Sequence, residues 1–327
     1  MPDSPAMHRD IARRTTALLP VLAAVLSACA SRTAAVTGPV SVPGVRAVAT
    51  ATNMEIRFDT LVAYVMDADV VFFGEQHDDP ETHRVEFGLL DALGRSGRPV
   101  VLSLEMFERD AQVALDDYLA GRTTEAAFLA RSRPWERYVT DYRPMVELAR
   151  ARGWPVVAAN VPRSLASAVG RKGLSALDTL TAVERRWAAT DLQCPRDAYH
   201  ARFMDDMKGH SAGGAAPSPG DSLPTAIAER YYLAQCVKDE TMAESIANAM
   251  RRAPSNAIVV HYNGAFHSDY GQGTAERLRR RAGELRLAII TAVPMVDPSE
   301  ATAQGHDGRA DYLIFTKRIP PKAAVIR

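Results

Sequence analysis

The chain has 327 residues, of which 47% are hydrophobic and 24% are charged, and its formal net charge at neutral pH is zero. This composition is typical of a globular protein with one large core or two modest ones. The balanced charge argues against a nucleic-acid partner, because binding driven by counterion release needs a surplus of lysine and arginine on one face.

The first 28 residues read as a signal segment rather than as part of the fold. Arginines at positions 9, 13 and 14 precede an apolar run at residues 17–25, which is too short to span a bilayer. The run ends in Leu26-Ser27-Ala28-Cys29, which resembles a bacterial lipobox. That resemblance implies cleavage before Cys29 and acylation of the new terminus by chains such as palmitate.

Several acyl chains hold a protein on a membrane almost permanently, so we expect a lipid-anchored protein that does not cross the membrane. Ala30 rather than aspartate follows Cys29, which favours the outer membrane within the cell envelope. The alternative is an ordinary secretory signal in which the cysteine is incidental.

Residues 29–50 have the composition of a tether, and residues 51–327 are predicted to form a single α/β domain. Apolar runs of strand type alternate there with helical patterns, which indicates a mostly parallel central sheet flanked by helices. The predicted strands are 70–73, 100–104, 156–159, 258–260 and 287–291, with an edge strand at 312–315. The predicted helices are 81–93, 110–119, a further helical stretch to 152, and 275–281.

Helices between about residues 178 and 251 are predicted to form a subdomain over the sheet, interrupted by a flexible loop near 207–224. His210 lies in that loop. Cys194 and Cys236 flank it, and in an oxidising compartment they either pair or remain buried thiols. The sequence leaves both states open.

Two apolar runs end in the same pattern, Gly-x-x-His: Gly74 to His77 and Gly264 to His267. The carboxyl ends of parallel strands line one crevice, so we expect His77 and His267 to face each other there. Glu75 and Glu105 follow strands as well. Two carboxylates in a partly dry crevice need compensation from a divalent cation, imidazoles or an arginine.

The alternative is a purely structural role, in which each histidine only caps or hydrogen-bonds the helix that follows. Asp78 and Asp79 before Pro80 are predicted to cap that helix, and His83 is predicted to lie on its surface. Trp135 is expected to pack, whereas Tyr142 and Arg143 can reach over the crevice. Tyr270 is a core residue, a lid or a phenolate ligand.

Taken in order, five segments resemble the ChaN-like haem-binding lipoproteins, within the group that includes the Tiki, TraB and erythromycin-esterase-like proteins. No segment alone is specific, but the ordered set over residues 53–292 is. The segments are Gly74-Glu75-Gln76-His77-Asp78, Leu104-Glu105-Met106-Phe107, Tyr142-Arg143-Pro144, Val157-Ala158-Ala159-Asn160 and Gly264-Ala265-Phe266-His267-Ser268-Asp269-Tyr270-Gly271.

The resemblance implies an α/β fold and an outer-membrane-attached protein that holds haem for iron acquisition. Two haems are expected to lie face to face between two subunits, with an outer-membrane haem receptor as a further partner. A tyrosine is expected to ligate the iron, since phenolate suits ferric iron, with a histidine from the partner subunit assisting. The candidate haem contacts are Tyr270, Tyr142, Tyr262, His267 and Arg143, with His210 as an outside candidate.

The wider group also suggests a metal-dependent hydrolase of the Tiki type. His77, Glu105 and His267 would then bind zinc, manganese or cobalt, and Glu75 would activate a water molecule. Without a metal, His77 would act as the base, oriented by Glu75 or Glu105. A structural lipoprotein with a vestigial crevice is the third alternative.

Overall fold

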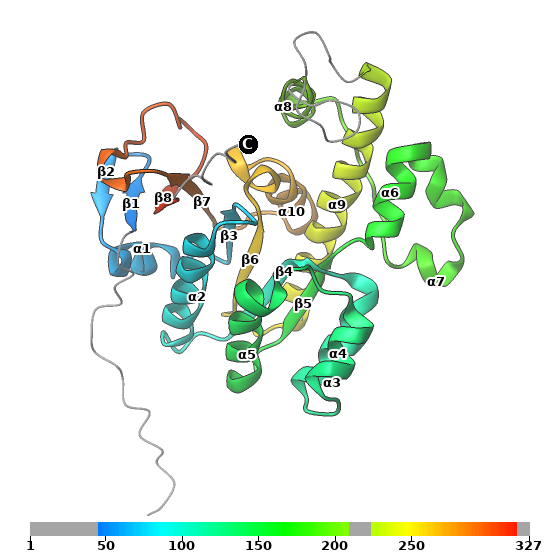
Figure 1. The fold of residues 1–327 in the computed structure, drawn as a ribbon, viewed down its shortest axis with the longest axis horizontal. Helices are drawn as coiled ribbons and strands as arrows, with labels where there is room; N and C mark the ends of the chain where they lie inside the picture. Colours follow the sequence, from blue (N-terminus) through cyan, green and yellow to red (C-terminus); the bar gives the residue numbers. More distant parts are fainter. Residues whose placement is uncertain (1–44, 209–223, 319–327) are drawn as a thin grey trace, which may run out of the picture. The chain divides into compact units, whose positions relative to one another are not determined.

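The computed structural model describes residues 45–208 and 224–318, all of which belong to one compact unit, Pro39–Arg327. Its centre is an eight-stranded sheet with the strand order β2-β1-β8-β7-β3-β6-β4-β5 (Figure 1). Every pairing from β8 to β5 is parallel, whereas β1 pairs antiparallel with both β8 and β2. The strands are β1 Arg46–Ala49, β2 Met54–Ile56, β3 Val70–Glu75, β4 Val100–Glu108, β5 Val156–Asn160, β6 Ile258–Gly264, β7 Leu287–Met295 and β8 Tyr312–Lys317.

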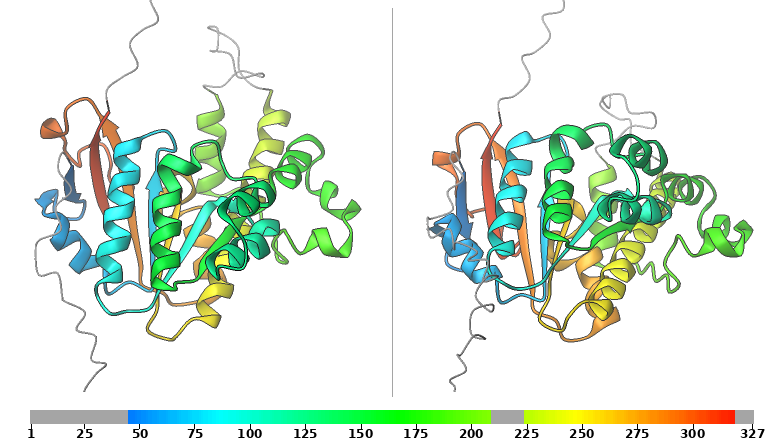
Figure 2. Two further views of the ribbon diagram at one scale, coloured as in Figure 1. Left: turned by 60° about the horizontal axis from the view of Figure 1, so that its bottom comes forward. Right: turned by 90° about the horizontal axis from the view of Figure 1, so that it is seen from below.

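Helices cover both faces of this sheet (Figure 2). Adjacent strand residues point to opposite faces, so Phe73 packs with α1, α2 and α5, whereas Phe72 packs with α9 and α10. This is the predicted α/β architecture. The helices are α1 Phe58–Val65, α2 Pro80–Gly94, α3 Gln112–Leu119, α4 Glu125–Ser132, α5 Arg143–Arg152, α6 Arg163–Lys172, α7 Ala182–Arg185, α8 Ala198–Met207, α9 Thr225–Arg252 and α10 Thr274–Ala282.

The structure differs from the sequence-based expectation at one side of the sheet. Strand β8 is not an edge strand, because β1 and β2 extend the sheet beyond it. Strand β1 begins at Arg46, inside the predicted tether, and α1 was not predicted. Strands of three and four residues carry too little alternation to be recognised in a sequence. The proposed signal segment, Cys29 and His210 lie outside the described residues.

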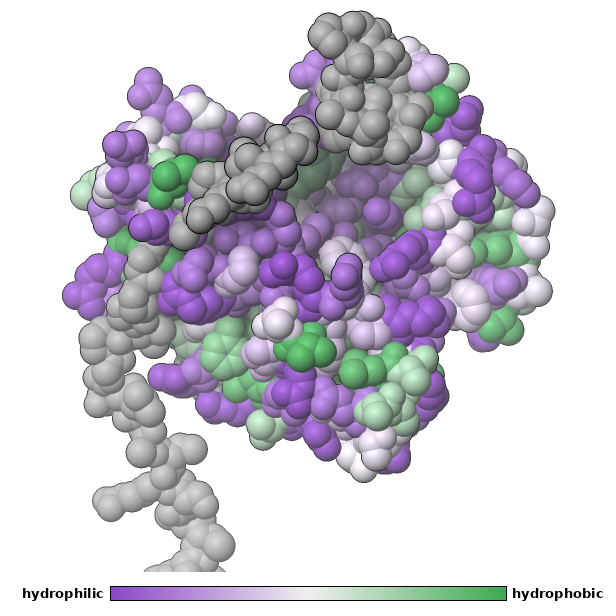
Figure 3. Space-filling model, viewed as in Figure 1, coloured by the Kyte–Doolittle hydropathy of each residue, from purple (hydrophilic) through white to green (hydrophobic). Residues whose placement is uncertain are grey.

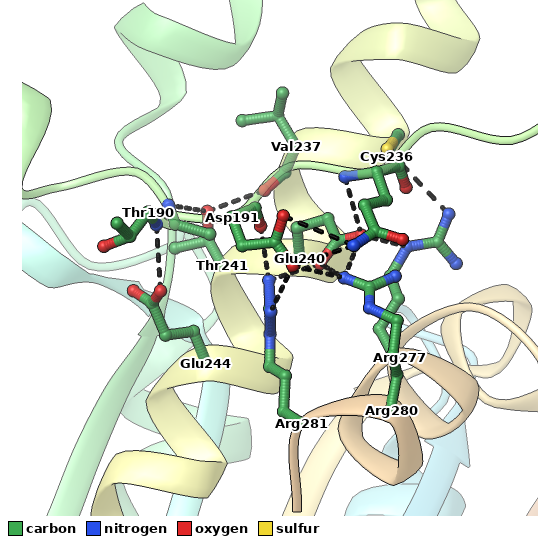
Figure 4. A network of polar contacts seen from close by, with 12 residues as sticks. Thr190, Asp191, Cys236, Val237, Glu240, Thr241, Glu244, Arg277, Arg280 and Arg281 are labelled. Atoms are coloured by element: carbon green, nitrogen blue, oxygen red, sulfur yellow. Dashed lines mark hydrogen bonds and ion pairs between the residues drawn. The ribbon is translucent and has the colours of Figure 1, made fainter.

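The region predicted as a helical subdomain, about residues 178–251, contains α7, α8 and most of α9, and α9 packs against both α6 and α10. Glu240 of α9 is fully buried and accepts hydrogen bonds from Arg280 and Arg281 of α10 and from the backbone N–H of Gln193 (Figure 4). These charge-assisted hydrogen bonds connect α9 to α10 and to the segment before α8. No helix in the described part of the chain is long and apolar enough to cross a membrane.

Cys194 and Cys236 form a disulfide that connects the segment before α8 to α9, with 5.7 Å between their Cα atoms. In the chain-entropy model a bridge across 42 residues contributes about 4 kcal/mol to stability. We predict that a Cys29→Ser form, denatured without reductant, shows no titratable thiol. Two titratable thiols per chain would contradict the bridge.

Candidate functional site

The two Gly-x-x-His segments lie side by side at the carboxyl ends of β3 and β6. These strands are parallel neighbours in which Glu75 is paired with Gly264. A Cβ atom on Gly264 would lie 2.7 Å from Nε2 of His77, and one on Gly74 would lie 2.8 Å from the Cα atom of Ala265. Both glycines are therefore required by close contact between the two segments.

Glu105 of β4 connects the second segment to its histidine. One oxygen, Oε2, accepts a hydrogen bond of 2.8 Å from the backbone N–H of Gly264, and the other, Oε1, lies 3.3 Å from Nε2 of His267. The structure thus gathers Glu75, His77, Glu105 and His267 at adjacent strand ends. We call this group the Glu/His recess. Figure 3 shows one face of the molecule, which is hollowed near its centre.

His77 is the partly exposed member of the recess, with 42% of its side chain accessible. Its Nδ1 lies 2.5 Å from Oε1 of buried Glu75, which also accepts a 2.6 Å hydrogen bond from the Tyr142 hydroxyl. Trp135 packs edge-on against the imidazole, with 4.8 Å between ring centroids. Burial lowers the pKa of His77, but Glu75 and Glu105 outweigh burial and raise it. A buried carboxylate therefore orients an accessible imidazole.

His267 is buried between two carboxylates. Its Nδ1 lies 2.7 Å from Oδ1 of Asp239 in α9, and Asp239 accepts further hydrogen bonds from the hydroxyls of Tyr199 and Thr274. Burial lowers the pKa of His267, but Glu105 and Asp239 outweigh burial and raise that pKa to about 9. His267 is therefore an imidazolium with a fixed orientation at neutral pH.

This raised pKa predicts a pH dependence of stability. Protonated His267 contributes its full stabilisation below its ordinary pKa of 6.5, and the contribution disappears as the pH rises through about 9. We expect the free energy of unfolding to fall by about 3 kcal/mol across this window, because one pKa unit corresponds to about 1.4 kcal/mol. Urea unfolding of wild type and His267→Gln at several pH values measures the difference, and equal slopes would contradict it.

A second polar cluster lies beside Glu75 and corrects one prediction. His83, predicted on the helix surface, is only 4% exposed. Its Nδ1 is 3.0 Å from Oε2 of Glu86 and 3.5 Å from Oε2 of Glu75, and its Nε2 is 3.4 Å from Oδ2 of Asp141. Asp79 caps α2 as predicted, because its side chain accepts a hydrogen bond from the backbone N–H of Glu81. The first turn of the helix then carries His83 into the interior.

Among the described residues, Glu75, His83 and Glu86 form a group whose potential metal-ligating atoms all lie within 4.8 Å of one another. The trio predicted from sequence, His77, Glu105 and His267, does not form such a group. The two sets share the same region of the molecule, but only the first has a compact arrangement of ligand atoms.

Sequence reasoning missed Asp239 and Tyr199, which hold His267. Both lie in helices remote in sequence from either Gly-x-x-His segment, and a buried aspartate within the pattern of α9 gives no signal of its partner. Glu86 was missed because a glutamate on a helix is usually exposed.

The three candidate haem tyrosines lie in different surroundings. Tyr142 is buried with its hydroxyl bonded to Glu75, and Tyr262 is buried with its hydroxyl donating 2.7 Å to the backbone carbonyl of Glu86. Burial raises the pKa of both phenols above the usual value for tyrosine. Arg143 forms an ion pair with Glu125. Tyr270 differs, since it is 45% exposed and its backbone has a left-handed φ of 63°.

Tyr270 lines a cavity of about 1020 Å³ along the β1, β2, β7 and β8 side of the sheet. We call this the Tyr270 cavity. Its walls combine the apolar or aromatic side chains of Met54, Ile56, Tyr64, Leu287 and Tyr312 with the guanidinium groups of Arg279, Arg286 and Arg309. None of the four Glu/His recess side chains lines this cavity, so the two sites are separate.

The family described as "Haem-binding uptake, Tiki superfamily, ChaN" matches residues 61–278. A solved structure described as cofacial heme binding to ChaN of Campylobacter jejuni superposes with a TM-score of 0.61 at 15% identity, over 84% of this chain and 97% of that chain, which shows a shared fold. The chloroplastic protein RETICULATA-RELATED 5 of Arabidopsis thaliana is 22% identical over 272 residues, 78% of this chain. The chain spans about a third of that relative's length, 35%.

Proposed function

Because the chain belongs to the ChaN family of haem-binding uptake proteins in the Tiki superfamily, we propose that it binds haem in the Tyr270 cavity and serves iron acquisition at the cell envelope. One observation carries the choice of site: of the three candidate tyrosines, only Tyr270 is exposed and lines a cavity. A ligand to haem iron has to reach the face of the porphyrin, and buried Tyr142 and Tyr262 have their hydroxyls committed elsewhere.

The lining of the Tyr270 cavity fits a haem. Its volume of about 1020 Å³ lies just above the range of about 300–1,000 Å³ usual for cofactor sites. Apolar and aromatic walls suit the porphyrin, and the exposed guanidinium group of Arg279 suits a propionate. Arg279 lies close to Tyr270, because its Nη1 donates a 3.1 Å hydrogen bond to the backbone carbonyl of Gly271. Its guanidinium group is therefore near enough to bind a propionate of a haem ligated by Tyr270. Bound ferric haem would supply a Lewis-acidic iron, which the Tyr270 phenolate would ligate.

The anchoring and assembly of the protein are part of the proposal. Lipid attached to Cys29 would hold the chain on the periplasmic side of the outer membrane. Met54 and Tyr64, which line the Tyr270 cavity, are 63% and 55% exposed. Exposed apolar side chains around a cofactor cavity favour a haem-linked homodimer, in which a partner subunit covers the second face of the haem. An outer-membrane receptor that supplies haem is the further expected partner.

A haemin titration of the mature protein tests haem binding. Tyrosine ligation predicts a saturable absorbance change with a high-spin ferric charge-transfer band. No change beyond that of haemin in the same detergent buffer would overturn the proposal.

The Glu/His recess supports a second candidate function, a hydrolase. The specific observation is the 2.5 Å contact between His77 Nδ1 and Glu75 Oε1, which leaves Nε2 of a partly exposed imidazole available to accept a proton. Imidazolium His267 beside Glu105 would stabilise developing negative charge. Since His77, Glu105 and His267 do not form a compact ligand group, the arrangement favours His77 as a direct base over the metal trio.

Hydrolysis of a panel of peptide, ester and lactone substrates tests this candidate. His77→Gln and Glu75→Gln are each expected to abolish turnover while haemin binding persists. Turnover that survives both substitutions would exclude the recess as the catalytic centre.

A further inference from the structure

We propose that Glu75, His83 and Glu86 form a site for one divalent first-row transition-metal ion, buried beneath His77. Nothing in this proposal depends on haem binding, and the residues differ from the His77, Glu105 and His267 trio considered above. The carboxylates come from the end of β3 and the second turn of α2, and the imidazole comes from the first turn of α2.

The geometry of the three side chains is that of a preformed ligand set. Each offers one ligand atom, and these atoms lie within 4.8 Å of one another. A single ion at the usual bond lengths of about 2.0–2.2 Å holds its ligand atoms at most about 4.4 Å apart, so small shifts of these side chains complete the ligand set. All three residues are at most 4% exposed.

Two carboxylate oxygens of the cluster lack a hydrogen-bond donor. Oε2 of Glu75 and Oε1 of Glu86 are buried and make no hydrogen bond as long as both carboxylates are ionised. Oε2 of Glu75 lies on the His83 side, 3.5 Å from Nδ1. A buried carboxylate oxygen without a donor costs free energy, and a cation held between the two carboxylates removes this cost.

The other nitrogen of His83 is held as metal-binding histidines usually are. Nε2 lies 3.3 Å from the backbone carbonyl of His77 and 3.4 Å from Oδ2 of Asp141. Both are acceptors, so with a cation bound Nε2 would donate its proton to them, and Nδ1, which faces the two glutamates, would ligate the ion. Asp141 is itself held by Arg137, at 2.5 Å from Nε. A carboxylate behind the imidazole fixes the tautomer and raises the basicity of the ligating nitrogen.

The donor set defines the class of ion. Two carboxylates and one imidazole suit Mn²⁺, Fe²⁺ or Zn²⁺, whereas Mg²⁺ prefers oxygen ligands alone. Three protein ligands leave coordination positions for water or for a ligand that enters past His77. The ion would therefore keep an open coordination position, as metal ions in catalytic sites do.

A proton is the alternative occupant. Burial and the neighbouring Glu75 raise the pKa of Glu86 well above its usual value, so that a neutral acid can also relieve the repulsion. The two alternatives predict opposite results for Glu86→Gln. Glutamine reproduces the shape and hydrogen bonding of the protonated acid, but it is a much poorer metal ligand than carboxylate.

The test uses the mature protein after chelator treatment and desalting, titrated calorimetrically with Mn²⁺ and Zn²⁺. Wild type is expected to bind one ion per chain and to gain thermal stability, with no comparable effect of Mg²⁺. Glu86→Gln is expected to keep its fold by circular dichroism and to bind at least about 100-fold more weakly. His267→Gln is the matched control, because it removes a buried histidine from the recess but not from this site.

Absence of an ion in wild type, or unchanged affinity in Glu86→Gln, would overturn the inference. Loss of the ion in His267→Gln with retention in Glu86→Gln would assign the metal to the other trio instead. Pulsed electron paramagnetic resonance of the Mn²⁺-loaded wild type gives a check that needs no variant. Coupling to an imidazole nitrogen is expected, and its absence would contradict ligation by His83.

Discussion

Replacing Glu105 by alanine is expected to lower the free energy of unfolding by about 3–5 kcal/mol, because it leaves a buried charge without its partner. Glu105 is 3% exposed, accepts a hydrogen bond from the backbone N–H of Gly264 and pairs with His267. The substitution removes the acceptor of that N–H and one of the two carboxylates that hold the His267 imidazolium. Urea unfolding at pH 6 measures the loss, since His267 is protonated there.

Glu125→Ala provides the matched control for this change. Glu125 also pairs with one cation, Arg143, but both side chains are partly exposed. Ion pairs of this kind contribute about 0–1 kcal/mol. A loss at Glu105 no larger than the loss at Glu125 would show that the recess is not held together by the buried pair.

Replacing Tyr270 by phenylalanine is expected to abolish the high-spin ferric charge-transfer band and to weaken haemin binding at least about 10-fold, because the change removes only the ligating oxygen. The ring that forms part of the cavity wall remains. Absorbance titration with haemin measures both effects, and circular dichroism checks the fold.

Two other tyrosines make this prediction specific. Tyr231 on α9 is 44% exposed, almost the same as Tyr270, but does not line the cavity, so Tyr231→Phe is expected to bind haemin as wild type does. Tyr64 lines the cavity and is 55% exposed. Loss of the band in Tyr64→Phe with retention in Tyr270→Phe would move the iron to the opposite wall.

The sequence could predict that the residues of the Glu/His recess come together, because their proximity follows from the topology of the sheet. Two apolar runs that end in the same tetrapeptide were expected to deliver His77 and His267 to one crevice. The parallel pairing of Glu75 with Gly264 places these segments side by side. Glu105 could be added for the same reason, since β4 is the neighbour of β6.

The partners behind the recess could not be predicted, because they depend on helix packing rather than on strand order. Asp239 meets His267 only because α9 crosses the sheet with that residue on its buried face. His83 was assigned to the surface by its position in an amphipathic helix, whereas the turn at Asp79 buries it against Glu75. The periodicity of a sequence indicates which face of a helix is buried. It does not indicate which polar group of another element that face contacts.

The tyrosines show the same limit. The sequence could not rank Tyr142, Tyr262 and Tyr270: Tyr142 precedes a predicted helix, Tyr262 follows a predicted strand, and Tyr270 follows the second Gly-x-x-His segment. Only their burial separates them: the first two have hydroxyls fixed in the interior, and Tyr270 projects from a left-handed turn into a cavity.

Anomalous diffraction at the iron edge from crystals of the haemin-loaded protein locates the haem iron in the molecule. We expect an iron peak within bonding distance of the Tyr270 hydroxyl oxygen, with the propionates on the Arg279 side of the cavity. An iron peak at the Glu/His recess, away from Tyr270, would contradict it.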